Sequence, residues 1–176
     1  DIEPLLRDAK QQLHDESDYL KEGGFLQRYR DLLADAPAFA LPRLHADLTT
    51  QSVLAVDYME GVPIESLVDA PQAVRNRVMD LLFDLLLREV FEFRLVQTDP
   101  NFANYRYDPA TGQLILLDFG ATRVYKAAMA NHFKHLVKGA MLHDRATMRA
   151  ACLAIGYFEA ATQERHVQTV LDIGET

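Results

Sequence analysis

Three oxygen-bearing side chains between Leu95 and Val124 have the types and the spacing of a metal and phosphate site. Asp99 and Asn104 are separated as D-x-x-x-x-N, and Asp118 opens the triplet D-F-G fourteen residues after Asn104. Carboxylate and amide oxygens suit Mg²⁺, which proteins usually hold with a few such groups together with phosphates and water. The sequence therefore predicts Asn104 and Asp118 as ligands of a Mg²⁺ ion that bridges nucleotide phosphates.

A predicted β-hairpin positions these side chains. Residues 104–107 and 113–117 are two short β-prone runs, and the residues between them include Pro109 and Gly112, which suit a hairpin loop. Folding the hairpin brings the start of its first strand beside the end of its second. We therefore expect Asn104 and Asp118 to lie side by side.

The order of the three residues is that of a protein-kinase active site. There the first Asp accepts the proton of the substrate hydroxyl, while the Asn and the Asp of D-F-G hold the metals. Taken singly, residues 99–101 are more often a turn and residues 118–120 the end of a strand. In this order and joined by a hairpin, they favour catalytic roles for Asp99, Asn104 and Asp118, with ATP and Mg²⁺ as cofactors.

One departure from the kinase pattern is informative, because Gln97 and Thr98 stand where His-Arg usually precedes the catalytic Asp. Through the segments QTDPNFAN (residues 97–104) and DFGATR (residues 118–123), this chain closely resembles the UbiB-like (AarF-domain) atypical kinase family. Within that family it resembles the branch that supports coenzyme Q biosynthesis. The resemblance extends to ESDYLKE at residues 16–22 and to IGYF at residues 155–158. It therefore covers nearly the whole chain.

The resemblance implies further roles. Glu22 resembles the αC glutamate that pairs with the phosphate-binding lysine, and Glu16 with Asp18 resembles the E-x-D signature, whose partner segment lies upstream in the family. The implied activity is ATPase-linked support of ubiquinone (coenzyme Q) biosynthesis. The implied partners are a small-molecule or lipid substrate and ubiquinone-biosynthesis proteins. The implied location is cytoplasmic or peripheral to the inner membrane, on the matrix side in a mitochondrion.

Composition and length narrow the class of protein. The chain has 176 residues, the size of one domain, and its net charge of −8 argues against a nucleic-acid partner. The single cysteine, Cys152, excludes an internal disulfide and a cysteine-based metal site.

The most apolar stretch, residues 78–95, carries several charged side chains and is predicted to be a core helix. Because the first residue is Asp1, we expect the chain to be part of something longer.

The coarse secondary structure predicts an α+β fold, mainly α, of the protein-kinase-like type. Residues 1–60 are expected to form a partial N-lobe, and residues 61–176 a helical C-lobe. A helix is predicted over residues 2 to about 21, either broken at Gly23 and Gly24 or kept continuous by close packing there, with helical pattern again over residues 25–33. Other predicted elements are strands at 39–48 and 52–58 and helices at 74–94, 126–142, 144–156 and 160–172.

The stretch from Asp57 to Gly61 follows an apolar strand, where kinases place the hinge between their lobes. Backbone groups of Asp57, Tyr58 and Met59 are therefore predicted to hydrogen-bond the adenine of the nucleotide. An ordinary exit from a strand to a loop is the alternative, and the position of the stretch in the motif order favours the hinge.

Two expected kinase features are absent from the sequence. No glycine-rich phosphate loop and no V-A-x-K strand precede Glu22, so the lysine that pairs with Glu22 is expected outside this chain. Only about five residues separate Gly120 from the next predicted helix, and no A-P-E follows. Because the long segment there forms the docking shelf for peptide substrates, a small, lipidic or water acceptor is expected.

Three other functions compete with this interpretation. An aminoglycoside- or choline-kinase-like phosphotransferase shares D-x-x-x-x-N but usually carries His-Gly before the Asp. A true protein kinase is disfavoured by the short segment after Gly120. A nucleotide-binding scaffold of a lipid-biosynthesis complex would retain the ligands and turn over little or no ATP.

Overall fold

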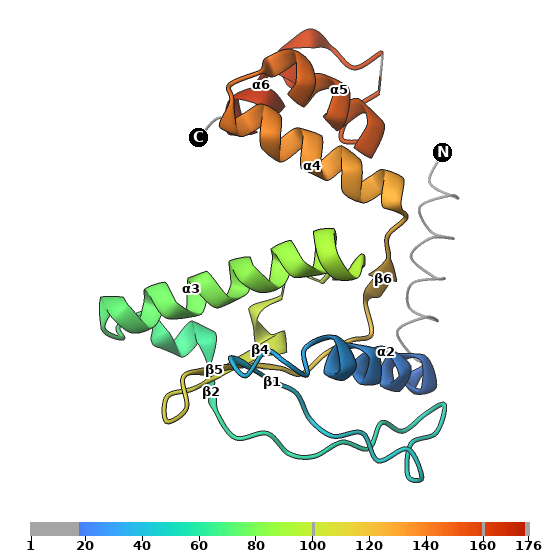
Figure 1. The fold of residues 1–176 in the computed structure, drawn as a ribbon, viewed down its shortest axis with the longest axis vertical. Helices are drawn as coiled ribbons and strands as arrows, with labels where there is room; N and C mark the ends of the chain where they lie inside the picture. Colours follow the sequence, from blue (N-terminus) through green and yellow to red (C-terminus); the bar gives the residue numbers. More distant parts are fainter. Residues whose placement is uncertain (1–17, 100, 160, 175–176) are drawn as a thin grey trace. The chain divides into compact units, whose positions relative to one another are not determined.

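The computed structural model describes residues 18–99, 101–159 and 161–174. The chain divides into two compact units (Figure 1). Unit 1 comprises the residues up to 87 together with 96–123, and unit 2 comprises residues 88–95 and 124–176. These units are not the predicted N-lobe (residues 1–60) and C-lobe (residues 61–176), and the boundary between the lobes stays a prediction. The predicted helix over residues 2–21 lies outside the described residues except at its end.

Unit 1 begins with helix α2 (Tyr19–Leu32), which is capped by Asp18. The Asp18 carboxylate accepts a hydrogen bond from the backbone N–H of Lys21 at 3.3 Å, which satisfies one of the free donors of the first turn. The helix runs without a break through Gly23 and Gly24, so the first alternative, a broken helix, is wrong. The second alternative, close packing that requires a small residue, agrees with the surroundings of Gly23. A Cβ built there would lie 3.2 Å from the methyl groups of Leu44.

A four-stranded mixed sheet forms the β part of unit 1, in the order β1-β5-β4-β2. Strands β4 (Tyr105–Asp108) and β5 (Gln113–Leu116) form the predicted antiparallel hairpin, with Tyr105 opposite Leu116. Its loop is closed by Asp108, whose carboxylate accepts from the N–H of Ala110 and the hydroxyl of Thr111. Strand β1 (Phe39–Ala40) pairs parallel to β5, and β2 (Val62–Pro63) pairs antiparallel to β4.

The two strands predicted over residues 39–48 and 52–58 are largely wrong. Regular strand covers only Phe39–Ala40, and the remainder is joined by single bridges between Leu44 and Val56 and between Thr50 and Val53. Backbone hydrogen bonds from His45 N–H to the Ala55 carbonyl at 2.9 Å and from Asp57 N–H to the Arg43 carbonyl at 3.0 Å pair the two segments only locally, and side-chain hydrogen bonds of Thr49 add to them. The Thr49 hydroxyl donates to the His45 carbonyl at 2.9 Å and accepts from the Ala55 N–H at 3.2 Å.

The predicted helix at 74–94 is present but changes character near its end. It comprises α3 (Gln72–Leu87), which starts after Pro71, followed by the π-helix η2 (Arg88–Phe93). Arg94 then adopts a positive φ of 52° and ends the helix. The short 3₁₀ helices η1 (Ile64–Leu67) and η3 (Phe102–Asn104) lie in unit 1, and strand β3 (Leu95–Gln97) pairs with β6 (Thr122–Val124).

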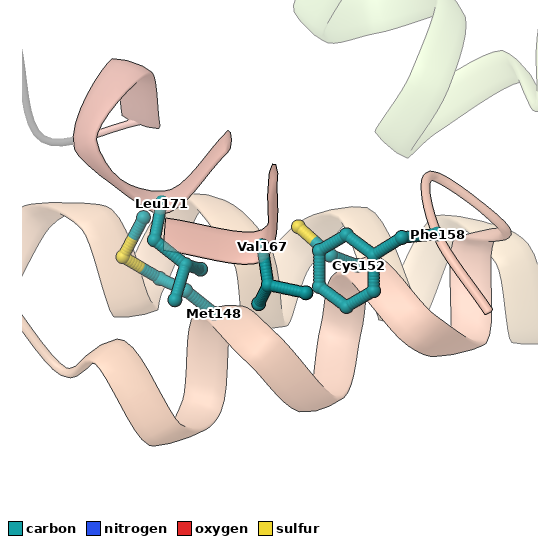
Figure 2. Close-up of a cluster of buried hydrophobic side chains, with 5 residues drawn as sticks. All are labelled: Met148, Cys152, Phe158, Val167 and Leu171. Atoms are coloured by element: carbon teal, nitrogen blue, oxygen red, sulfur yellow. The ribbon is translucent and has the colours of Figure 1, made fainter. Parts of the chain in front are cut away.

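The three helices predicted after residue 123 are confirmed with small shifts of their ends. They are α4 (Ala127–Met141), α5 (Arg145–Ile155) and α6 (Glu164–Gly174), all in unit 2. Figure 2 shows the buried cluster that joins α5 and α6, made of Met148, Cys152, Phe158, Val167 and Leu171. Burial raises the pKa of the Cys152 thiol, as expected for a packed side chain.

The described helices include none that is both long enough and apolar enough to cross a membrane.

Candidate nucleotide and metal site

The predicted catalytic loop brings Asp99 and Asn104 into direct contact. The Asn104 side-chain amide donates to Asp99 Oδ2 at 3.0 Å, and Asp99 Oδ1 accepts from the backbone N–H of Asn101 at 3.3 Å. The Asn101 side chain in turn accepts from the N–H of Ala103 at 3.0 Å, which caps η3. These hydrogen bonds close the loop, so the half-buried side chains of Asp99 and Asn104 lie in contact with each other.

The hairpin places Asp118 at the same end of the sheet as Asn104, as predicted. Beyond the last paired residues of the hairpin, the Leu117 N–H donates to the Asn104 carbonyl at 3.0 Å, and Asp118 follows directly. The half-buried Asp118 carboxylate accepts from the Gly120 N–H through Oδ1 at 2.9 Å. The backbone that carries the two predicted metal ligands is therefore fixed by strand pairing.

Gln97 connects the catalytic loop to the D-F-G segment, a role that the sequence analysis missed. Its side-chain oxygen accepts from the Asp99 N–H at 3.0 Å, and its side-chain nitrogen donates to the Asp118 carbonyl at 2.9 Å. One neutral amide thus bridges the backbones of two predicted catalytic residues. The only available signal was that glutamine replaces histidine in the motif.

Thr98 makes a second connection between the same segments. Its hydroxyl donates to the Ala121 carbonyl at 2.7 Å, and its backbone N–H lies 3.4 Å from the same oxygen. The two residues that depart from the kinase pattern therefore both tie the loop to the turn that follows Asp118.

Glu22 reaches the D-F-G segment from α2. It is buried, with an exposed fraction of 8%, and its Oε1 accepts from the Phe119 N–H at 3.4 Å. Burial and the nearby Asp118 carboxylate raise the pKa of Glu22, against the lowering effect of the Phe119 N–H. The buried Phe119 ring also packs on Tyr29 of α2, with the ring centroids 5.1 Å apart. The helix and the segment are thus joined by a polar and an aromatic contact.

The predicted lysine partner of Glu22 is not among the residues that the structure describes. Within that part of the chain, no ion pair reaches the Glu22 carboxylate, so this pairing stays a prediction. Of the E-x-D signature, Glu16 lies outside the described residues, while Asp18 caps α2.

The residues present fit Mg²⁺ delivered together with phosphates. The described residues contain no group of three His, Cys, Asp or Glu side chains that would form a complete metal cage. Mg²⁺ does not require one, because one or two carboxylates with phosphate and water suffice. Burial is the larger cause of the raised pKa of Glu22, and repulsion from the Asp118 carboxylate adds to it. A divalent cation would relieve this repulsion.

A groove of about 610 Å³, large enough for a nucleotide, opens beside these residues. The groove is lined by Ala103 and Tyr105, which flank Asn104, and by Leu117, which precedes Asp118. Its other lining residues are Pro63, Glu65, Ser66 and Arg106. The groove is therefore lined by chain neighbours of both predicted metal ligands.

The predicted hinge residues do not line this groove. Asp57 forms a 2.6 Å contact with the His45 ring, and Tyr58 is 80% exposed. The lining begins at Pro63, beyond Met59 and Gly61. Hydrogen bonding of Asp57, Tyr58 and Met59 to adenine therefore stays a prediction.

The fold and these groups define a kinase-like protein. In a solved structure, "The complex structure of Rv3197-erythromycin from Mycobacterium tuberculosis", one chain matches with a TM-score of 0.78 and 19% identity, over 98% of this chain and 44% of that chain. At this identity the likeness shows the fold alone, and it confirms the predicted kinase-like α+β architecture.

The family follows from the sequence comparisons. The model of the ABC1 atypical kinase-like domain matches residues 1–152, and the chain belongs to this family. It is 37% identical over 164 residues to "Atypical kinase COQ8B, mitochondrial" of Danio rerio, covering 91% of this chain and 26% of that protein. It is 33% identical over 178 residues to "Atypical kinase COQ8, mitochondrial" of Saccharomyces cerevisiae, covering 99% and 36%. The resemblance to UbiB-like atypical kinases is thus confirmed.

The chain spans only 26% to 36% of the length of these curated relatives.

Proposed function

We propose that this protein binds Mg-ATP and acts as an atypical kinase or ATPase that supports coenzyme Q biosynthesis. The observation that carries the proposal is the joining of Asp99, Asn104 and Asp118 at one end of the β4–β5 hairpin, beside a groove of 610 Å³. Membership of the atypical kinase family and the COQ8 relatives support the biological role.

The side chains divide the chemistry among themselves. Asn104 and Asp118 would hold Mg²⁺, which supplies charge to the phosphate oxygens when bound. Asp99 is oriented by the Asn104 amide at 3.0 Å and would accept the proton of the attacking hydroxyl or water. Asn104 therefore contributes twice, through its oxygen to the metal and through its nitrogen to Asp99.

The acceptor is proposed to be small, lipidic or water. Thr122–Val124, soon after the D-F-G triplet, is a strand paired with β3, and α4 begins at Ala127. So short and paired a segment leaves little backbone for a peptide docking shelf. By the names of the relatives, we propose work with ubiquinone-biosynthesis proteins, peripheral to the inner membrane and on the matrix side in a mitochondrion.

Replacing Asp118 by Asn tests the metal assignment. The variant keeps the side-chain shape but removes a charge that offsets Mg²⁺, so the affinity for Mg-ATP should fall at least about tenfold. Isothermal calorimetry on the full-length protein measures it, with exposed Asp80→Asn of α3 as the matched control. Unchanged Mg-ATP affinity in a folded Asp118→Asn protein would contradict the assignment.

Hydrolysis of ATP at saturating Mg²⁺, measured in the same preparation, separates an enzyme from a scaffold. Turnover that Asp99→Ala abolishes supports catalysis. Tight binding without turnover supports a scaffold.

A further inference from the structure

A groove of about 560 Å³ lies between helices α4 and α5 and has no role in the proposed function. Histidines and a lysine of α4 line one side of it, and small side chains of α5 line the other. Both helices belong to unit 2, whereas Asp99, Asn104 and Asp118 belong to unit 1. The groove has the volume of a small-molecule pocket, which is roughly 300–1,000 Å³.

The close packing of α4 on α5 holds this groove in shape. A Cβ added at Gly139 would lie 2.8 Å from Met148 Cγ and 3.0 Å from the Met148 backbone nitrogen, so the approach requires glycine. Met148 is in turn part of the buried cluster that joins α5 to α6 (Figure 2). Further along α5, Ala150 and Ala154 have small, exposed side chains that leave the space beside α4 unfilled.

The α4 side of the groove belongs to a basic segment of an acidic chain. Residues 119–143 contain no Asp or Glu, although the whole chain contains 26 of them and has a net charge of −8. The two arginines of α5 are paired with acids of α6, at 2.7 Å in each pair. In the part of the chain that the structure describes, no comparable ion pair neutralises His132, His135 or Lys138.

These three side chains form a row along α4. They follow one another at intervals of three residues, which keeps them on one side of the helix and spreads them over about 9 Å of its axis. His135 and Lys138 are exposed and His132 is half-buried, so a ligand in the groove can reach them. Asp144 also lines the groove, but its carboxylate caps α5, where it accepts from the Thr147 N–H at 3.1 Å and hydroxyl at 2.6 Å.

We propose that this groove binds an organic phosphate, with the phosphate beside His135 and Lys138 and an apolar body against Leu142 and the alanines of α5. Phosphate oxygens accept charge-assisted hydrogen bonds, for which a lysine ammonium supplies three donors and an imidazole one or two. Leu142 lines the groove although 64% of its surface is exposed, and an apolar ligand would cover it. A free phosphate ester and a phospholipid headgroup both supply this chemistry. The inference does not depend on the nucleotide site.

Calorimetry on the full-length protein, with inorganic phosphate and with hexyl phosphate, tests the class of ligand. Hexyl phosphate should bind at least about tenfold more tightly, because its chain covers apolar surface that inorganic phosphate leaves in water. Equal affinity for the two would overturn the assignment of an apolar body.

Two variants separate the charge of the groove from its shape. Lys138→Met should weaken the binding of both ligands about tenfold, because a charged hydrogen bond to the phosphate is lost. Ala154→Leu fills the groove without changing its charge, so it should weaken hexyl phosphate more than inorganic phosphate.

Lys134→Met is the matched control, because Lys134 is an exposed lysine of α4 that does not line the groove. It should leave both affinities unchanged, and equal weakening by the two lysine variants would reduce the site to diffuse surface charge and overturn the inference. Thermal unfolding checks that each variant folds, and His135→Gln, at an exposed position, takes the place of Lys138→Met if that protein does not fold.

Vesicles identify the source of the phosphate. Binding to phosphatidylcholine vesicles that contain phosphatidic acid, lost in Lys138→Met but not in Lys134→Met, would support a lipid headgroup as the ligand. Binding of hexyl phosphate without binding of these vesicles would support a free ester. A wild-type protein that binds neither hexyl phosphate nor the vesicles overturns the inference and leaves the proposed function untouched.

Discussion

At the scale of single residues, the side-chain amide of Gln97 supplies both a hydrogen-bond donor and a hydrogen-bond acceptor. The Asp99 N–H needs an acceptor and the Asp118 carbonyl needs a donor, and a glutamine side chain supplies one of each. A glutamate of the same shape would supply only acceptors. Gln97 therefore acts as a positioning residue, through the backbones of Asp99 and Asp118.

Substitution of Gln97 by Glu should weaken Mg-dependent nucleotide binding about 10- to 100-fold, the usual cost of losing a supporting hydrogen bond at a metal site. Binding measured without Mg²⁺ should change much less, because the lost bond positions the metal ligand Asp118. Calorimetry with and without Mg²⁺ provides both values.

Gln113→Met is the matched control for this prediction. Gln113 also donates its side-chain amide to a backbone carbonyl, that of Pro37 at 2.7 Å, but at the far end of the hairpin. The Gln113→Met substitution should lower the free energy of unfolding slightly and leave the Mg²⁺ dependence of nucleotide binding unchanged. An equal effect of both variants would show that Gln97 is only a structural hydrogen bond.

At the scale of elements, the two glycines of α2 differ although they are neighbours. A Cβ at Gly24 meets nothing within 4 Å, whereas one at Gly23 lies 3.2 Å from Leu44. Gly24→Ala should therefore raise the free energy of unfolding by about 1 kcal/mol, the usual gain of alanine over glycine within a helix. Gly23→Ala should gain less or lose stability, because Leu44 must move.

Denaturant unfolding of both variants measures this difference. Equal stabilisation by the two alanines would mean that the close approach of α2 to Leu44 is not maintained in solution.

An ion pair between α5 and α6 predicts a pH dependence. Two nitrogens of Arg149 donate to the two oxygens of Glu164, at 2.7 and 2.9 Å. These bonds lower the pKa of Glu164 to about 2 from its ordinary value of 4.5. Because the folded state lowers the pKa, the stabilisation is present above 4.5 and is lost as the pH falls towards 2.

Glu164→Gln should therefore lower the unfolding temperature at about pH 6 but have little effect near about pH 2. The effect at about pH 6 should be small, because both side chains are exposed. Glu159→Gln, at an exposed carboxylate without an ion pair in the described part of the chain, controls for the loss of charge. A difference that does not depend on pH would contradict the pairing.

The elements with strong local signals were the ones predicted correctly from the sequence. The hairpin follows from β-prone runs around a loop with Pro109 and Gly112, and the last three helices follow from their apolar periodicity. The strands predicted over residues 39–48 and 52–58 were largely wrong, because regular strand is limited to Phe39–Ala40 and the remaining backbone pairing is confined to isolated bridges. The Gln97 bridge depends on a contact with Asp118, which is distant in sequence and which no local pattern encodes.

At the scale of the whole molecule, the phosphate-binding lysine is the component that is not accounted for. Glu22 is buried and its pKa is raised, and no described cation pairs with it. A buried carboxylate without a cation is costly, so a lysine from residues outside this chain would complete the pair. The curated relatives are long enough to contain such residues, since the chain spans 26% to 36% of them.

The last prediction is that this 176-residue chain alone binds Mg-ATP much more weakly than a full-length protein that contains the lysine. The metal ligands Asn104 and Asp118 would be present in both, but only the longer protein would neutralise Glu22 and enclose the phosphates. Calorimetry with Mg-ATP on the two proteins measures the difference, and adenosine serves as the control, because its binding should need neither lysine nor metal. If both proteins bind Mg-ATP equally tightly, the phosphate contacts lie within these residues, and Glu22 does not require a lysine from elsewhere.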